Sequence, residues 1–398
     1  MVSKMKKIGI CTCYDSRNYG SMLQAYATKA IIDNLGLESE YIVYQKNNTY
    51  IQLLCQLPRL LNKDLLFDKF LILKKKIALI CHPSFRNAEM VREKAFLKFK
   101  DNYYRDFSVP YCGYKELVNG ARNYSTVLVG SDQLWTPGGL ATNFYNLMFV
   151  PSDINKVSYA TSFGVSSIPW YQINRTRRYL QRINCLSVRE IKGVEIVKNI
   201  ADRDAKIVVD PTLLLTKEDW AERIPREEII HEPYIFCYFL GDNPEHRILA
   251  KELQRRTNCK IVCTPFLDSY VKNDEHFGDY KLFDVGPDRF LNLIRGASYV
   301  LTDSFHGSVF SIIHHKKFVV FNRYSENKNS RNSRIDSLCD ILGLDDRRYS
   351  FSRDIYDQIV RSIDYTMVDN TIDKLRYDSI DFLSNAIGLG LKDDHCRR

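Results

Sequence analysis

The stretch Tyr299–Ser311 brings together a histidine, hydroxyl groups and a glycine where a strand is expected to pass into a helix. Apolar residues follow Phe305 at helical spacing and indicate one buried face of that helix. His306 and Gly307 would lie in its first turn, beside free backbone N–H groups and the positive end of the helix dipole. Such a turn suits the binding of a phosphate or carboxylate. A buried histidine that only caps the turn is an equally good interpretation of this stretch by itself.

A second loop carries small polar residues to the start of another expected helix. Strands over Lys7–Cys13 and Glu40–Gln45, with a helix over Met22–Leu35 between them, predict a βαβ unit. The polar residues of its first loop are Asn18, Gly20 and Ser21. Capping of the helix explains Asn18 or Ser21 taken singly. The loop holds no GxGxxG pattern, so a dinucleotide fingerprint is absent.

Polar or glycine residues also follow four further expected strands. The strands cover Thr126–Val129, Val157–Ala160, Leu186–Val188 and Ile207–Val209, and the residues after them include Gly130, Ser131, Asp132, Gln133, Arg189 and Asp210. Parallel sheets bind ligands at the carboxyl ends of their strands, so we expect these side chains to gather at one edge. Asp132 is either a catalytic base or a turn former, and the second role is common for aspartate.

The second half of the chain repeats the alternation of strands and helices. Expected strands cover Tyr234–Leu240, Lys260–Cys263, Tyr299–Thr302 and Phe318–Phe321. The pattern therefore predicts an α/β protein with two domains, over residues 1–228 and 229–360, and a C-terminal helix and frayed tail over 361–398. An arginine-rich loop over 323–334 includes Arg331 and Arg334 and is either solvated or an anion-binding lid.

One segment carries most of the positive charge of the chain. The formal net charge is +9, and residues 46–106 hold 13 Lys and Arg against 6 Asp and Glu. Charge confined to one segment argues against nucleic-acid binding. The amphipathic run 65–76 favours a basic helical insert over about 46–111 with a solvated face. The alternative is peripheral contact of 46–106 with an anionic membrane surface.

Cysteine usage indicates a reducing compartment and gives no metal site. The 11 cysteines are scattered, and no cysteine pair has a nearby histidine at zinc-ligand spacing. We expect reduced thiols in the cytoplasm, and the chain shows neither a secretory signal nor a run of roughly 20 apolar residues.

Six of these stretches, taken in order, resemble the polysaccharide pyruvyl transferase family. They are Asn18–Tyr26, Gly130–Trp135, Ser187–Glu190, Asp210–Thr212, Thr302–Gly307 and Asn332–Ile335. The resemblance extends over roughly residues 7–345. It implies a fold similar to the GT-B glycosyltransferases, with two Rossmann-like domains that face each other across a cleft. It also implies transfer of the enolpyruvyl unit of phosphoenolpyruvate to sugar hydroxyls of a surface polysaccharide or its precursor, giving a pyruvate ketal without a cofactor or metal.

The family's histidine corresponds to His306, which we expect to exchange protons or to bind the leaving phosphate. Asp132 is the candidate base toward the sugar. The expected substrate-binding residues are Asn18, Gly20, Ser21, Ser131, Gln133, Arg189, Ser304, Gly307, Ser308, Arg331 and Arg334. Many members carry an arginine where this chain has Ser304, so Arg189, Arg331 and Arg334 are the expected substitutes for that anion clamp.

Two other functions fit the sequence. One is a GT-B glycosyltransferase that uses a nucleotide sugar, since a fold does not fix a function. The other is a non-catalytic saccharide-binding or assembly protein. Ser304 favours this alternative, whereas His306 argues against it. None of these motifs identifies the acceptor sugar or indicates whether the acceptor is free or lipid-linked. We expect the protein in the cytoplasm, either free or at the inner face of the membrane.

Overall fold

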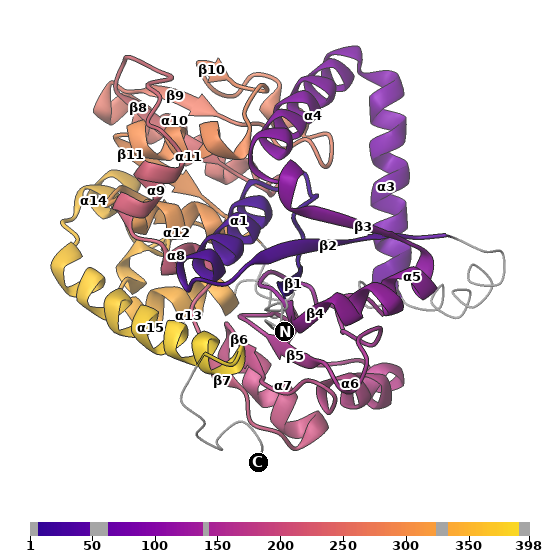
Figure 1. The fold of residues 1–398 in the computed structure, drawn as a ribbon. Coiled ribbons are helices and arrows are strands. Elements are labelled where there is room, and N and C mark those ends of the chain that lie inside the picture. Colours follow the sequence, from indigo (N-terminus) through magenta and orange to yellow (C-terminus); the bar gives the residue numbers. More distant parts are fainter. Residues whose placement is uncertain (1–6, 48–62, 138–142, 324–332, 390–398) are drawn as a thin grey trace.

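The computed structural model describes residues 7–47, 63–137, 143–323 and 333–389, and it contains two parallel five-stranded sheets (Figure 1). The first sheet has the strand order β3-β2-β1-β4-β5. Its strands are β1 (Lys7–Cys11), β2 (Ser39–Gln45), β3 (Ser108–Cys112), β4 (Tyr124–Val129) and β5 (Asn155–Ser158). A two-stranded parallel sheet of β6 (Ser187–Val188) and β7 (Lys206–Ile207) continues beside β5 through isolated bridges.

The second sheet has the order β10-β9-β8-β11-β12. This is the same topology as in the first sheet, with the third, second, first, fourth and fifth strands side by side in that order. Its strands are β8 (Tyr234–Tyr238), β9 (Lys260–Cys263), β10 (Tyr280–Lys281), β11 (Tyr299–Thr302) and β12 (Lys317–Val320). All of the pairings are parallel, and most strand residues are buried, as expected for sheets covered by helices on both faces. The predicted pair of Rossmann-like domains is therefore confirmed.

Helices connect the strands of both sheets. In the first half they are α1 (Tyr19–Asn34), α3 (Lys63–Cys81), α4 (Pro83–Tyr103), α5 (Gly113–Gly120), α6 (Ile173–Leu180), α7 (Ile191–Ala201), α8 (Pro211–Leu214) and α9 (Lys217–Arg223). In the second half they are α10 (Pro244–Thr257), α11 (Pro287–Gly296), α12 (Phe305–Ile313), α13 (Ser333–Leu342), α14 (Ile355–Val360) and α15 (Tyr365–Ala386). Single 3₁₀ turns cover Arg105–Phe107, Ala121–Asn123, Trp170–Gln172, Lys272–Asp274 and Asp345–Arg347.

The helical insert ends earlier than the sequence pattern predicts. Residues Ser108–Cys112 form β3, which pairs in parallel with β2 at the edge of the first sheet. Pro110 cannot donate a backbone hydrogen bond, and an edge strand is the place where a sheet tolerates proline. The described part of the insert therefore consists of the consecutive helices α3 and α4, which diverge from their connection and lead into an edge strand (Figure 1).

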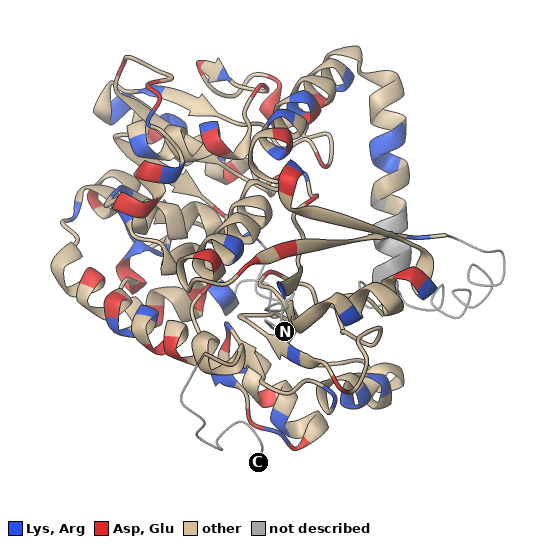
Figure 2. Ribbon diagram, in the orientation of Figure 1, with Lys and Arg blue, Asp and Glu red and all other residues tan. Residues whose placement is uncertain are grey.

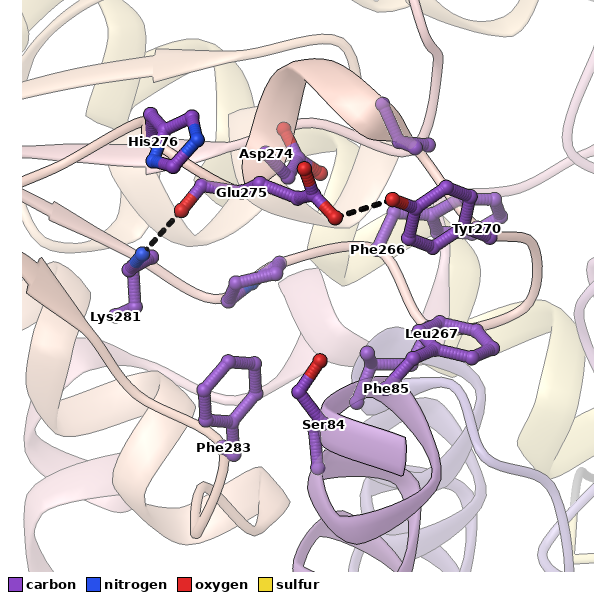
Figure 3. Close-up of a pocket in the computed structure, with 13 residues that line it drawn as sticks. Ser84, Phe85, Phe266, Leu267, Tyr270, Asp274, Glu275, His276, Lys281 and Phe283 are labelled. Carbon is purple, nitrogen blue, oxygen red and sulfur yellow. Dashed lines mark hydrogen bonds between the residues drawn. The ribbon is translucent and has the colours of Figure 1, made fainter. Parts of the chain in front are cut away.

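Helix α4 ties the insert to the second domain. Arg92 donates to Asp268 at 2.7 Å, and Phe85 and Ala88 pack with Leu267 in a small apolar cluster. A cavity of about 430 Å³ lies between the start of α4 and the loops that follow β9 (Figure 3). Tyr270 and other aromatic side chains line it, together with acidic and basic groups of the second domain.

The C-terminal helix α15 returns to the first domain. Its Ser379 hydroxyl accepts from the backbone of Val209 at 3.1 Å, and Arg376 donates to the carbonyl of Leu213 at 3.0 Å. Asn155, on β5, donates to the carbonyl of Ala386 at 2.7 Å. At its other end Tyr365 donates to the carbonyl of Lys316, so the helix contacts both domains. Within the described ranges, every helix is too short or too polar to cross a lipid bilayer.

Candidate active site

Two helix N-termini, one from each domain, begin the candidate site. Asn18 caps α1 and accepts from the backbone N–H of Ser21 at 3.1 Å. Ser304 caps α12 and accepts from the backbone N–H of Gly307 at 3.4 Å. Both side chains satisfy donors that a helix leaves unpaired in its first turn. Asn18 and Ser304 therefore have capping roles, as expected for Asn18 from the sequence, whatever contact they make with a substrate.

The two helices meet at Gly20 and His306. A Cβ atom built on Gly20 would lie 2.1 Å from Nδ1 of His306, closer than any real contact. The imidazole therefore lies directly on the backbone of α1, and it is 5% exposed. Only glycine leaves room for this contact between the domains. The absent side chain at position 20 lets a histidine of the second domain reach the polar residues of the first.

Replacing Gly20 with alanine is expected to lower turnover by about 100-fold, because the new methyl group must displace the imidazole by roughly 1 Å. Initial rates of product formation measure the effect. The double variant Gly20→Ala/His306→Ala is the control, since it removes the ring that the methyl group strikes. It should unfold at a higher temperature than Gly20→Ala alone. Wild-type turnover in Gly20→Ala would contradict the contact.

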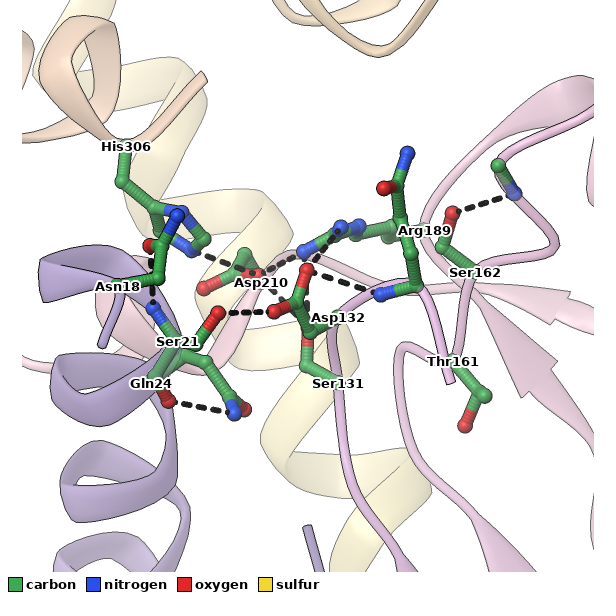
Figure 4. A network of polar contacts seen from close by, with 12 residues as sticks. Asn18, Ser21, Gln24, Ser131, Asp132, Thr161, Ser162, Arg189, Asp210 and His306 are labelled. Carbon is green, nitrogen blue, oxygen red and sulfur yellow. Dashed lines mark hydrogen bonds and ion pairs between the residues drawn. The ribbon is translucent and has the colours of Figure 1, made fainter. Parts of the chain in front are cut away.

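A buried polar network of the first domain lies opposite the imidazole (Figure 4). Arg189, just after β6, donates to Asp210 at 2.6 Å and to the hydroxyl of Ser131 at 3.1 Å. Its other terminal nitrogen contacts Asp132 at 3.3 Å. Ser21 donates to Asp132 as well, so α1, β4, β6 and the segment after β7 all contribute. The carboxyl ends of the strands thus bring together the polar residues that the sequence predicts there.

Asp210 faces the histidine from the centre of this network. Nε2 of His306 lies 3.7 Å from its carboxylate, which is ion-pair distance but longer than a hydrogen bond. The other carboxylate oxygen accepts from the backbone and hydroxyl of Thr212 at 3.1 and 2.8 Å. Burial alone would raise the pKa of Asp210, but His306 and Arg189 hold that pKa well below its usual range. Asp210 is therefore negatively charged at neutral pH.

Asp132 occupies a left-handed turn, with a φ angle of 81°, at the end of β4. One of its oxygens accepts from the backbone N–H of Gln133 at 2.9 Å, the contact of a turn former. Burial would raise the pKa of Asp132, but Arg189, His306 and the Ser21 hydroxyl lower it overall. A carboxylate with a lowered pKa is a weak base. The geometry thus favours the interpretation of Asp132 as a residue that positions its neighbours.

Two arginines flank the ring of Phe305, the first residue of α12. The guanidinium carbon of Arg189 lies 4.9 Å from the ring centroid, and that of Arg334 lies 5.6 Å from it. The charge of Arg189 is balanced by Asp210 and Asp132, which raise its pKa against the effect of burial. Burial and the nearby Arg189 lower the pKa of Arg334 to about 10. Among the described residues, no carboxylate lies within 4.0 Å of Arg334.

A cavity of about 170 Å³ opens beside these arginines. Arg189, Asp210, Phe305 and Arg334 line one side of it, and helices α13 and α15 line the other with apolar residues, two serines and Asp378. None of these four residues lines the larger cavity near α4. Because Arg334 has no carboxylate within ion-pair distance among the described residues, its side of the smaller cavity is a candidate site for a small anion. Arg331 lies outside the described residues.

The other predicted site residues are placed less directly. Gly307 cannot carry a Cβ, since that atom would lie 2.5 Å from Oγ1 of Thr302, so this glycine serves packing. Ser308 is fully buried and donates to the carbonyl of Ser304 at 3.1 Å, within its own helix. The Gln133 amide lies against Gly164, with its nitrogen 2.8 Å from where a Cβ on that glycine would be.

Sequence reasoning missed the importance of Asp210 and Phe305. The sequence places Asp210 at the end of a strand and in one of the family motifs without giving it a role, although it is the residue that links Arg189 to His306. The motif Asp210–Thr212 carries the signal, since an aspartate before proline also caps α8. Phe305 was assigned to the buried face of its helix, and it is buried, but it also contacts both arginines.

The chain is similar to one known family over most of its length. A family model described as polysaccharide pyruvyl transferase matches residues 18–325. This range includes His306, Gly20 and the polar network. No curated protein matches the chain significantly.

Solved structures of low sequence identity are similar to the chain. MnaA of S. aureus, solved with UDP, has a TM-score of 0.50 and 10% identity, over 97% of this chain and 98% of that chain. UDP-GlcNAc 2-epimerase of Methanocaldococcus jannaschii, solved with UDP-GlcNAc and UDP, has a TM-score of 0.46 and 11% identity, over 97% of this chain and 100% of that chain. The first of these similarities shows the fold alone, which is GT-B-like.

Proposed function

The chain belongs to the polysaccharide pyruvyl transferase family, and from this premise we propose that it transfers the pyruvyl unit of phosphoenolpyruvate to a saccharide. Members of a transferase family share a class of reaction, so the chain is a transferase. The identity of the donor is the proposal. One observation carries it: His306 of the second domain reaches a charged network of the first domain at the meeting of two helix N-termini.

The proposed reaction needs a group that exchanges protons. The methylene carbon of phosphoenolpyruvate takes up a proton, and a sugar oxygen bonds to the adjacent carbon as its own proton leaves. A second sugar hydroxyl then bonds to the same carbon, the bond to the phosphate oxygen breaks, and the phosphate departs with the electron pair and the second proton. The products are a cyclic ketal and inorganic phosphate. Histidine is the side chain best suited to both proton transfers near neutrality.

His306 is positioned for that role by contacts on both sides of its ring. Gly20 contacts it on the Nδ1 side, and Nε2 has no hydrogen-bond partner among the described residues although it is buried. A buried polar atom is normally paired, so the free Nε2 is suited to a substrate. Asp210 stands 3.7 Å away with its negative charge and favours an orientation of the imidazole that keeps Nε2 in the site.

The anionic groups of the donor need positive partners. The first turns of α1 and α12 present backbone N–H groups at the positive ends of their dipoles. Arg334 adds a cation without a described carboxylate partner. We assign the clamp to Arg334 in place of the arginine that many members carry at position 304. Arg189 holds the network together, because two carboxylates take up its charge.

The acceptor is proposed to be a saccharide of a cell-surface polysaccharide or its precursor, either free or lipid-linked. We propose that the reaction takes place in the cytoplasm. Nine cysteines within the described ranges are free thiols, which fits a reducing compartment.

Thermal unfolding in the presence of candidate donors tests the proposal. Phosphoenolpyruvate at 100 times its Kd is expected to add about 2.7 kcal/mol to the free energy of unfolding. Inorganic phosphate, the proposed product, should stabilise more weakly, and an Arg334→Met variant should lose most of the phosphoenolpyruvate effect. Stabilisation by a UDP-sugar with none by phosphoenolpyruvate would overturn the donor assignment and favour glycosyl transfer.

A further inference from the structure

Helix α3 exposes an apolar stripe to solvent. Phe70, Leu73, Ile77 and Ile80 are between 53% and 77% exposed. Their spacing of three, four and three residues places them on one face of the helix. A surface helix normally turns such a face toward the core, and large exposed apolar stripes mark interaction sites. The stripe therefore needs an explanation outside the fold.

The opposite face of α3 holds the helix on the protein. Ala78 is buried in the cluster with Phe85 of α4, and Lys75 donates to the buried Glu89 at 2.8 Å. At 3.6 residues per turn, Ala78 and Lys75 lie across the helix from the stripe. The orientation of α3 is thus fixed by α4, and the stripe lies on the face of α3 that turns away from these contacts.

Positive charges border the stripe and continue on α4. Lys74 and Lys76 are exposed, and helical geometry places one on each side of the stripe. Helix α4, which Figure 2 colours with basic and acidic bands, adds three further exposed cations, which are Arg86, Lys94 and Lys98. Glu89 is buried, and Glu93 is paired with Arg17 at 2.8 Å. The side chains of residues 70–98 are described except for Leu71. Within this range, every exposed charged side chain that is not in an ion pair is positive.

We propose that the α3–α4 pair is a membrane-docking surface that lies on an anionic lipid bilayer. An apolar stripe between lysines matches the interfacial helices that insert into the boundary between headgroups and acyl chains. A second copy of the chain is a poorer partner, because a symmetric contact through this face would bring like charges together. The sequence left a solvated basic face and a lipid surface as alternatives, and the exposed apolar stripe favours the lipid surface. The inference is independent of the proposed donor.

Co-sedimentation of the full chain with vesicles tests the docking surface. We expect binding to vesicles rich in phosphatidylglycerol at low salt, weaker binding at high salt, and little binding to phosphatidylcholine alone. Lys74→Glu/Lys76→Glu should weaken the binding by at least roughly 30-fold, at about 1 kcal/mol for each cation lost. Leu73→Glu/Ile77→Glu should weaken it further, since apolar insertion is lost as well.

The matched control is Ile248→Glu on α10, where an equally exposed apolar residue, at 60%, lies far from the insert in sequence. It should bind vesicles as the wild type does. Lys74→Glu/Lys76→Glu and Leu73→Glu/Ile77→Glu should both keep the wild-type unfolding temperature, because they change exposed side chains. Absence of binding to phosphatidylglycerol vesicles at low salt would overturn the proposal. A dimer in sedimentation equilibrium that Leu73→Glu/Ile77→Glu dissolves would also overturn it, in favour of a second copy.

Discussion

The His306→Ala variant is expected to lose turnover by about 10²- to 10⁴-fold while it remains folded, because general acid–base catalysis contributes a factor of this size. The imidazole brings a buried nitrogen with no hydrogen-bond partner among the described residues to the junction of α1, α12 and the charged network. Its removal leaves the helix N-termini and Arg334 in place. The donor should therefore still bind, and the loss should fall on kcat more than on KM.

Two controls separate catalysis from packing. His315→Ala changes a histidine just beyond α12 that contacts Asp369 near the surface, and it should leave turnover unchanged. Imidazole added to His306→Ala should restore part of the lost rate, since alanine leaves a space beside Gly20 that a free ring can enter. Release of phosphate from phosphoenolpyruvate in the presence of acceptor follows the reaction. Turnover near the wild-type level in His306→Ala would refute the catalytic assignment.

Local pattern was sufficient to predict the two sheets. The strands are short apolar runs buried on both faces, and each ends in glycine or polar residues, so alternation with helices identifies them. It failed at β3, where Pro110 and a lower apolar content disguise an edge strand. It also failed at β10, a two-residue edge strand with one half-buried and one exposed residue, because no buried apolar run marks it. These are the places where pairing partners, and not local propensity, decide the structure.

The candidate site divides in the same way. The histidine and the glycine each stand out at an expected helix start, but their contact depends on how the domains face each other. No local pattern records that orientation. Arg189 looks like a free anion clamp in the sequence, and yet Asp132 and Asp210, 57 and 21 positions away, balance its charge. The sequence thus predicts which residue types gather, whereas the pairing of charges follows from packing.

Asp210→Asn is expected to destabilise the protein by about 3–5 kcal/mol, which is the usual effect of removing one partner from a buried ion pair. The Asp210 side chain is fully buried and accepts from Arg189, Ser131 and Thr212. An amide can replace some of these hydrogen bonds, but it cannot balance the guanidinium. The longer contact to Asp132 at 3.3 Å would be the one ion pair left to Arg189 among the described residues. Urea-induced unfolding at neutral pH measures the loss, and Asp153→Asn, at an exposed pair with Arg122, should change it by less than about 1 kcal/mol.

The pH dependence of the difference in unfolding free energy between wild type and Asp210→Asn identifies the cause of that difference. The pKa of Asp210 is lowered in the folded protein, so its charge contributes stability above the unfolded-state pKa of about 3.9. That contribution is lost as the pH falls through the folded-state pKa, where the carboxylate takes up a proton. The unfolding free energies of wild type and Asp210→Asn should therefore differ by a constant amount from neutral pH down to about pH 5 and converge at lower pH. If the difference stays constant in acid, the asparagine disturbs the packing of the site and not its charge balance.

Since the same carboxylate faces His306 at 3.7 Å, turnover should fall in this variant even where it remains folded.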